Sequence, residues 1–201
     1  MELNDAILQR RSIRKFKPDA VDSATIAKLL EAARLAPSGS NLQPWRFIAV
    51  TSEEMRAKLA ATTLDFVCTA PLVMVCCADL NATETRAERS AELRAAGAFA
   101  GTQLENMSLA DYQQRTQSDP AATAAYLSLN VAIAMEHMVL RAVELGLGSC
   151  WVFMFSRGKV KKVLDLPDNL LVTGLIPFGY PDQEPQPRPR LPLDQIYLGE
   201  V

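Results

Sequence analysis

Ala36-Pro37-Ser38-Gly39-Ser40-Asn41-Leu42-Gln43-Pro44-Trp45-Arg46-Phe47 is the most informative feature of this chain. Its small residues let a backbone approach a ligand closely, and Asn41 can both donate and accept hydrogen bonds. A second polar stretch, Arg10-Arg11-Ser12-Ile13-Arg14-Lys15-Phe16, lies about 25 residues earlier. Guanidinium groups, hydroxyls and free backbone N–H groups are what a phosphorylated, hydrogen-bonding cofactor needs. The pair therefore indicates a site for such a cofactor.

Each stretch also has a purely structural interpretation. Arginines at the end of a helix interact favourably with the helix dipole. The Gly, Ser and Asn residues of the loop are also what a connection between a helix and a strand requires for its turns. Taken one at a time, these residues leave both interpretations open.

Composition limits the class of protein. The chain has 201 residues, of which 49% are apolar and 22% charged, enough for one globular domain with a real core. The net charge of −2 and a pI near 5.5 argue against nucleic-acid binding. No signal peptide is visible, and the uncharged stretch over 120–135 is too short and too polar to span a membrane. We expect a cytoplasmic protein.

The four cysteines form no Cys-x-x-Cys pair, and His137 is the only histidine, so the sequence predicts no metal site. Cys68, Cys76, Cys77 and Cys150 are interpreted as reduced thiols without a disulfide framework. On its apolar helix His137 is expected to be a hydrogen-bonded interface residue rather than a general base. Trp45 and Trp151 are expected in the core rather than as stacking platforms.

Hydrophobic spacing, caps and breakers predict an α+β protein. Helices are expected over 4–10, 23–36, from 52, over 120–145 and over 159–164, and strands over 46–51, 72–77, 149–155 and 170–178. Residues 83–117 are polar and helical in composition. The helix over 120–145 is apolar on most of its circumference and would be about 39 Å long, which favours a place in a dimer interface. The proline-rich segment 181–201 is expected to be an extended arm with a strand-like tip at 196–198 that wraps a partner subunit.

Gly146-Leu147-Gly148-Ser149-Cys150-Trp151 resembles no phosphate loop of the Rossmann or Walker type. Four motifs taken in order do resemble those of the nitroreductase family of FMN-dependent oxidoreductases. They are residues 10–16, residues 37–45, residues 146–151, and Phe178-Gly179-Tyr180-Pro181 followed by residues 187–193. The resemblance covers nearly the whole chain except about residues 80–120.

The resemblance implies one nitroreductase-like domain over residues 1–201, with a variable helical lid at about 80–120 and a C-terminal arm at 181–201. Its sheet would be mostly antiparallel and flanked by helices, and two chains would form an intertwined homodimer that shares each FMN. Arg10 and Ser12, with Arg188 and Arg190, would hold the phosphate and ribityl end, and Arg14 would lie near the pyrimidine edge. Arg11 is expected among the cofactor-binding residues as well. Pro37, Ser38, Gly39 and Asn41 would come from the other subunit. Backbone N–H groups at Phe153 and Met154 would approach the reactive flavin nitrogen, in a stretch where some relatives have Glu-Gly.

The implied reaction is ping-pong: NAD(P)H reduces FMN by hydride transfer and leaves, and a nitroaromatic, a quinone or a related conjugated acceptor then takes the electrons. No side chain needs to act as a catalyst, since the flavin performs the redox chemistry. Two alternatives remain open. One is another flavin reaction on the same scaffold, such as dehalogenation, ene reduction or flavin breakdown, and the other is a non-catalytic flavin-binding dimer. A purely structural interaction protein would be colourless after purification.

Overall fold

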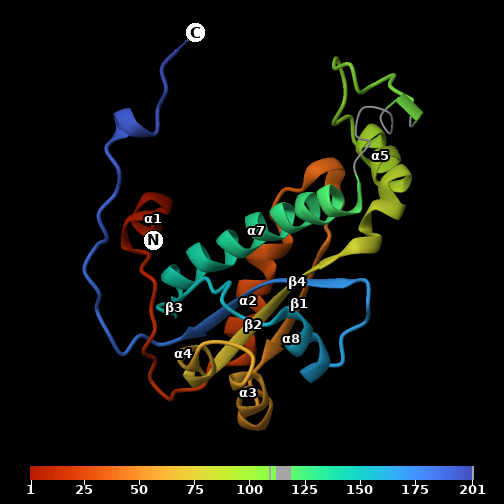
Figure 1. Cartoon of the computed structure of the whole chain (residues 1–201). Helices are drawn as coiled ribbons and strands as arrows, with labels where there is room; N and C mark the ends of the chain where they lie inside the picture. The colour runs from red at the N-terminus through yellow and green to blue at the C-terminus, as the bar shows by residue number, and fades with distance from the viewer. Residues whose placement is uncertain (109, 112–118, 201) are drawn as a thin grey trace.

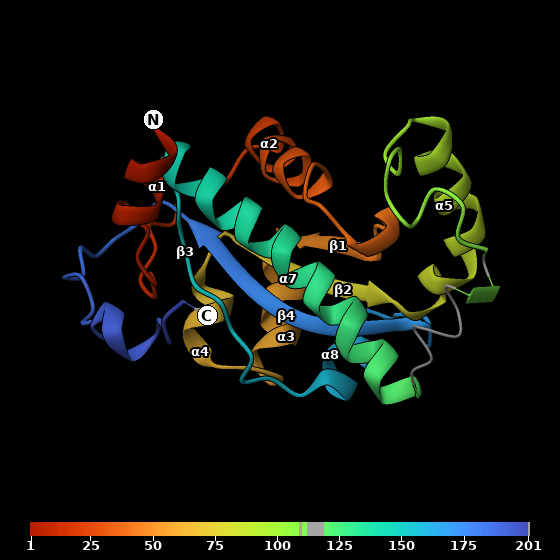
Figure 2. The ribbon, with the colours of Figure 1, turned by 90° about the horizontal axis from the view of Figure 1, so that it is seen from above.

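A four-stranded antiparallel sheet forms the centre of the molecule, and helices cover both of its faces (Figures 1 and 2). The computed structural model describes residues 1–108, 110–111 and 119–200. The strand order is β1-β2-β4-β3, with β1 at Trp45–Val50, β2 at Leu72–Asp79, β3 at Gly148–Ser149 and β4 at Leu170–Gly179. Every pair in this sheet is antiparallel. The predicted α+β class with a mostly antiparallel sheet is confirmed.

Side chains of β2 alternate between two hydrophobic cores, as the period of a strand requires. Met74 and Cys76 belong to the core under α2 (Ser23–Arg34) and α7 (Pro120–Glu144). Val73 and Val75 belong to the core on the opposite face, which α3 (Glu53–Ala60), α4 (Asp65–Thr69) and α8 (Arg157–Val163) cover. Because β2 is buried on both faces, its sequence is a continuous apolar run.

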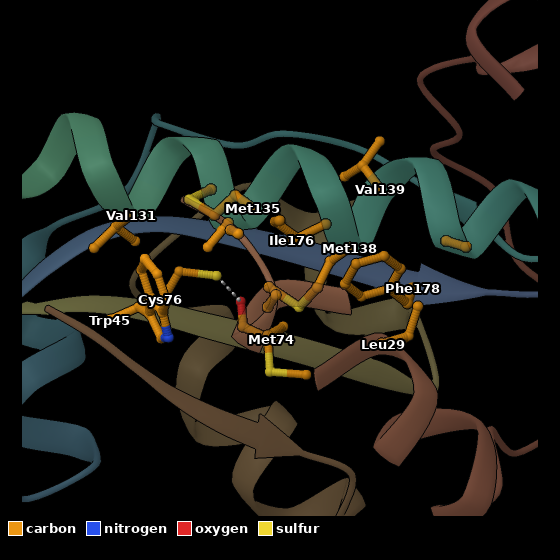
Figure 3. Close-up of a cluster of buried hydrophobic side chains, with 14 of the residues drawn as sticks. Leu29, Trp45, Met74, Cys76, Val131, Met135, Met138, Val139, Ile176 and Phe178 are labelled. Atoms are coloured by element: carbon orange, nitrogen blue, oxygen red, sulfur yellow. Dashed lines mark hydrogen bonds between the residues drawn. The ribbon is translucent and has the colours of Figure 1, made fainter. Parts of the chain in front are cut away.

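The first core lies between α7 and the sheet (Figure 3). Met135 and Met138 of α7 point toward Met74 of β2 and Phe178 of β4. Leu29 of α2 belongs to the same core. All five side chains are fully buried. Each such side chain contributes about 1.5–3 kcal/mol on burial, so this layer fixes α7 on the sheet.

Sequence signals set both ends of α7. The Asp119 carboxylate accepts a hydrogen bond from the backbone N–H of Ala122 at 2.7 Å, and Pro120 occupies the first turn. Gly146, at φ 73°, follows the helix end in the left-handed conformation that favours glycine. By length and composition alone α7 could cross a membrane, but eight of its residues are buried in the first core or beside it. Leu129 and Ile133 remain exposed on its outer side.

The two ends of the chain lie beside the same part of the body (Figure 1). α1 (Leu3–Gln9) packs against α7, and the segment after it pairs with β3 through Ser12 and Ser149. The C-terminal arm starts next to that segment, because Asp182 donates its backbone N–H to the carbonyl of Lys15 at 3.0 Å. Beyond this contact the arm runs past α1 and is exposed.

Two predictions of local structure are wrong. Of the predicted strand 149–155 only Ser149 is in the sheet, as the second residue of β3, and Val152 and Phe155 make single bridges to Leu175 and Thr63. The apolar run misled the prediction because Phe153 and Met154 are exposed rather than packed. The predicted strand-like tip at 196–198 is also absent: a short 3-10 helix, Leu193–Gln195, precedes it, and no neighbouring strand in the described chain is available for pairing.

Two further 3-10 helices and one α-helix complete the described elements: η1 (Gly39–Asn41), η2 (Leu80–Thr85) and α5 (Arg86–Ala95). The helical composition of 83–117 is confirmed for α5 but not for residues 96–106, which form turns and bends. Residues 109 and 112–117 of that segment lie outside the described residues.

Candidate functional site

A cavity of about 630 Å³ lies where α1, α7 and the C-terminal arm meet. Its wall contains four arginines and one serine that the sequence predicted as cofactor ligands: Arg10, Arg11, Ser12, Arg188 and Arg190. The chain therefore brings its two ends together around one cavity, as the prediction requires. The only acidic residue in this lining, among the described residues, is Glu136.

The arginines differ in how far their donors are already used. Arg11 donates to the carbonyls of Leu8 and Arg10, at 2.6 and 2.9 Å, and so caps the end of α1. Arg10 and Arg188 donate to no acceptor at hydrogen-bond distance within the described chain. Arg190 donates only to the neighbouring carbonyl of Pro189. Most guanidinium N–H groups of Arg10, Arg188 and Arg190 are thus available to a phosphate, which such groups bind bidentately.

A larger cavity of about 890 Å³ lies next to the first, on the other side of Arg11. Its wall includes Asp182 and Glu184 and only that one arginine. A phosphate dianion is therefore disfavoured there and favoured in the smaller, arginine-lined cavity.

Ser12 and Arg14 lie on an extended segment that β3 holds in place. The backbone N–H of Ile13 donates to the carbonyl of Ser149 at 2.8 Å. Arg14 donates to the carbonyl of Ser12 and lies over the ring of Phe66 on α4, 5.8 Å from its centroid. Arg14 does not line the arginine cavity, and its place near the pyrimidine edge of the flavin stays a prediction.

The arginines of this region affect the pKa of two titratable groups, in each case against a larger effect of burial. Burial raises the pKa of the Cys150 thiol, and Arg14, Ser12, Arg188 and Arg10 act in the opposite direction. Burial also raises the pKa of the Glu136 carboxyl, opposed chiefly by Arg10. The Arg10 Nε and Glu136 Oε1 atoms are 4.0 Å apart, at the outer limit of an ion pair.

The predicted loop at Pro37, Ser38, Gly39 and Asn41 lies on another side of α7 and lines neither of the two large cavities. Asn130 of α7 accepts the backbone N–H of Gly39 at 2.8 Å. The Ser38 hydroxyl accepts the backbone N–H of Gln43 at 3.0 Å. Ser40, Asn41 and Gln43 have φ values of 52°, 52° and 47°, a left-handed conformation that costs non-glycine residues about 1–3 kcal/mol each. Such local strain is common at ligand sites.

Phe153 and Met154, the predicted contacts of the reactive nitrogen, lie in an exposed turn after β3. Their carbonyls accept hydrogen bonds from Phe155 and from the Thr63 hydroxyl. Their backbone N–H groups have no acceptor within the described residues. Both are thus free to donate to a ligand.

Comparison with known proteins decides the family. The model of the nitroreductase family matches residues 7–180. The chain belongs to the nitroreductase family. A Thermus thermophilus protein named NADH dehydrogenase is 32% identical over 200 residues, covering 98% of this chain and 96% of that one. A Rhodospirillum rubrum protein named 5,6-dimethylbenzimidazole synthase is 29% identical over 198 residues, covering 93% of this chain and 85% of that one. A structure from Exiguobacterium sibiricum, solved in complex with FMN, has a TM-score of 0.84 at 20% identity and covers 98% of this chain and 96% of that one.

These findings confirm the family and the nitroreductase fold that the motifs indicated. The roles assigned to individual residues stay predictions. Two residues of the site were missed by sequence reasoning. Asn130, a buried amide in an apolar helix, carried a signal, because such a group needs partners and here binds the loop. Glu136 carried none, since a glutamate on a helix is ordinarily solvated.

Proposed function

We propose that this nitroreductase-family protein is an FMN-dependent oxidoreductase that uses NAD(P)H to reduce nitroaromatics, quinones or related conjugated acceptors. The observation that carries the proposal is the cavity in which Arg10, Arg188 and Arg190 present uncommitted guanidinium groups. FMN ends in a phosphate of about −1.5 to −2 charge, which matches that donor set. The FMN-bound fold neighbour and the names of the relatives support the same cofactor and reductant.

When bound, FMN would accept two electrons from NAD(P)H and pass them to the acceptor. The chain's own residues would position it. Arg10, Ser12, Arg188 and Arg190 would hold the phosphate and ribityl end, with Arg11 fixing the end of α1 beside them. Arg14 would place a positive charge beside the pyrimidine edge, and the backbone N–H groups of Phe153 and Met154 would donate to the reactive end of the ring.

The site would be completed by a second chain in a homodimer. The loop of Pro37, Ser38, Gly39 and Asn41 does not reach the arginine cavity within one chain, so a partner's loop would have to supply these groups. Exposed apolar side chains on α1, on α7 and on the arm are available for burial in such an interface. The proposed lid at about 80–120 would then cover the acceptor, and we expect the enzyme to work in the cytoplasm.

The purified protein tests this proposal through its visible spectrum. We expect a yellow protein whose flavin absorbance bleaches when NADH or NADPH is added without oxygen and returns with a nitroaromatic or a quinone. The double variant Arg10→Ala/Arg190→Ala is expected to purify mostly as apoprotein. Arg34→Ala, which removes an exposed arginine paired with Glu31 on α2, is the matched control. Full flavin occupancy of the double variant would remove the phosphate assignment.

A second candidate is different flavin chemistry on the same fold, which the relative named 5,6-dimethylbenzimidazole synthase favours. An assay panel separates the two, because only the reductase oxidises NAD(P)H rapidly with nitro or quinone acceptors. A flavin that binds but never bleaches would instead indicate a non-catalytic binding protein.

A further inference from the structure

Glu136 is the unexpected member of the arginine cavity. It projects from α7 into a wall otherwise lined by four arginines, a serine, a glutamine, prolines and aliphatic side chains. Its side chain is 43% exposed, so it faces the cavity rather than the core. A phosphate placed among these arginines would therefore share the cavity with a carboxylate.

Glu136 does not hold Arg10 in place by a hydrogen bond. The Nε to Oε1 distance of 4.0 Å is too long for one, and Arg10 has no other acceptor in the described chain. The indole N–H of Trp151 is buried without a partner within 3.5 Å, and it favours the ionised form of the Glu136 carboxyl. Removal of the Glu136 charge would thus leave the backbone and the packing of Arg10 intact.

We propose that the Glu136 carboxylate competes with the cofactor phosphate for Arg10 and so sets how strongly the site prefers a phosphorylated flavin over an unphosphorylated one. The inference rests on the proposed function, because it assigns the arginine cavity to the phosphate. Like charges in a partly desolvated cavity repel, so neutralisation of Glu136 tightens the binding of the dianion and leaves a neutral ligand unaffected.

The competition is also pH-dependent. The charged groups around Glu136 are Arg10 and Arg11 from the end of α1, Arg188 and Arg190 from the arm, and His137 on α7 itself. The pKa of Glu136 lies above its ordinary value because of burial, so protonation on acidification removes the repulsion at a pH where a solvent-exposed glutamate is still ionised.

Equilibrium binding to the full-length, flavin-depleted protein tests the proposal. Dissociation constants for FMN and riboflavin are measured by flavin fluorescence for the wild type, Glu136→Gln and Glu144→Gln. The control Glu144→Gln removes the same charge from the same helix outside the cavity, where Glu144 pairs with Arg141. We expect Glu136→Gln to bind FMN about tenfold more tightly than the wild type, the factor that one pKa unit of interaction represents. Riboflavin binding by Glu136→Gln, and FMN binding by Glu144→Gln, are expected to match the wild type.

A pH series provides a readout that a structural role would not change. The ratio of the wild-type to the Glu136→Gln dissociation constant for FMN is expected to fall toward one as the pH drops through the pKa of Glu136. Protonation of free FMN affects both proteins alike and cancels in this ratio, whereas protonation of the bound phosphate weakens its repulsion by Glu136 and lowers the ratio in the same direction. Unchanged or weaker FMN binding by Glu136→Gln, equal tightening for riboflavin, or a ratio independent of pH would each overturn the proposal.

Inorganic phosphate separates a failure of this inference from a failure of the proposed function. If the wild type binds no flavin, the proposed function fails. The thermal shift that inorganic phosphate produces then tests whether Glu136 competes with a phosphate for Arg10. Tighter phosphate binding by Glu136→Gln than by the wild type and Glu144→Gln would support competition at Arg10. Equal or absent phosphate binding in all three proteins would overturn it.

Discussion

Substitution of Gly148 by alanine is expected to disturb the segment that presents Ser12 and Arg14. A Cβ atom added at Gly148 would lie 2.6 Å from Cγ1, 2.8 Å from Cβ and 2.9 Å from Cγ2 of Ile13. Ordinary contact begins at 3.4 Å, so the two segments must separate by about 0.8 Å. Ile13 is 5% exposed and its backbone N–H is bonded to Ser149, so it has little room to move away.

Overpacking of this kind costs about 1–3 kcal/mol. Urea unfolding followed by circular dichroism, at one protein concentration, measures the free energy of unfolding of Gly148→Ala against the wild type. Gly158→Ala is the matched control, because a Cβ there meets nothing within 4 Å and the residue lies in α8. Alanine is the better helix former, so this control is expected to be neutral or more stable by up to about 1 kcal/mol.

A double-mutant cycle identifies the cause. Ile13→Ala removes both Cγ atoms but keeps the Cβ atom that would lie 2.8 Å from the new one, and by itself it costs about 2–5 kcal/mol. In that background Gly148→Ala should cost less than in the wild type, with a coupling of about 0.5–3 kcal/mol. FMN affinity should fall with Gly148→Ala, since Ser12 adjoins Ile13 and pairs with Ser149. Wild-type stability for Gly148→Ala, or the same loss of stability with and without the Ile13 side chain, would show that contact with Ile13 does not limit this position.

Three other perturbations follow from the same structure. Asn130→Ala leaves the Gly39 N–H without its acceptor and should lower the free energy of unfolding by about 1–3 kcal/mol. It should also lower the flavin occupancy, and wild-type values of both would show that Asn130 does not position the loop. Arg14→Ala should lower the flavin reduction potential and slow turnover, while Arg14→Lys keeps the positive charge and should change both quantities less. If both variants match the wild type, Arg14 does not lie beside the pyrimidine edge. Burial raises the pKa of Cys77 to about 12 and that of Cys76 well above its ordinary value, so both stay protonated at pH 8. A thiol reagent should then modify the partly exposed Cys68 first, as peptide mapping can show, and rapid labelling of Cys77 in the folded protein would contradict its burial.

The elements that sequence predicted well are those whose signals are local. Asp119-Pro120 and Gly146 mark both ends of α7, and the unbroken apolar run of β2 belongs to a strand covered on both faces. The run at 150–155 failed because apolar composition does not tell which side chains are packed: Val152 is buried, while Phe153 and Met154 are exposed. The tip at 196–198 failed because a strand needs a partner, which sequence composition cannot supply.

For the candidate site, the motifs identified which residues could bind the cofactor, but not which of their hydrogen-bond donors are already used within the chain. Four arginines and Ser12 do meet at one cavity, yet only the structure separates Arg11, whose donors cap α1, from Arg10 and Arg188, whose donors are free. The place of Glu136 in the same wall depends on how α7 is rotated against α1. That rotation is set by the packing of Met135, Met138 and Val139 in the first core, a tertiary property.

The geometry of α7 explains why the loop and the arginine cavity lie apart within one chain. Asn130, which holds the loop, and Glu136, which faces the arginine cavity, are separated by about 9 Å along the helix axis and about 120° around it. The loop and the cavity therefore lie on different sides of the same helix. To join them within one chain, either Gly39 would have to leave Asn130 or Arg10 would have to leave the wall formed with α7. A second copy would bring its own loop with the Gly39–Asn130 contact intact, so assembly of two chains requires the loss of neither contact.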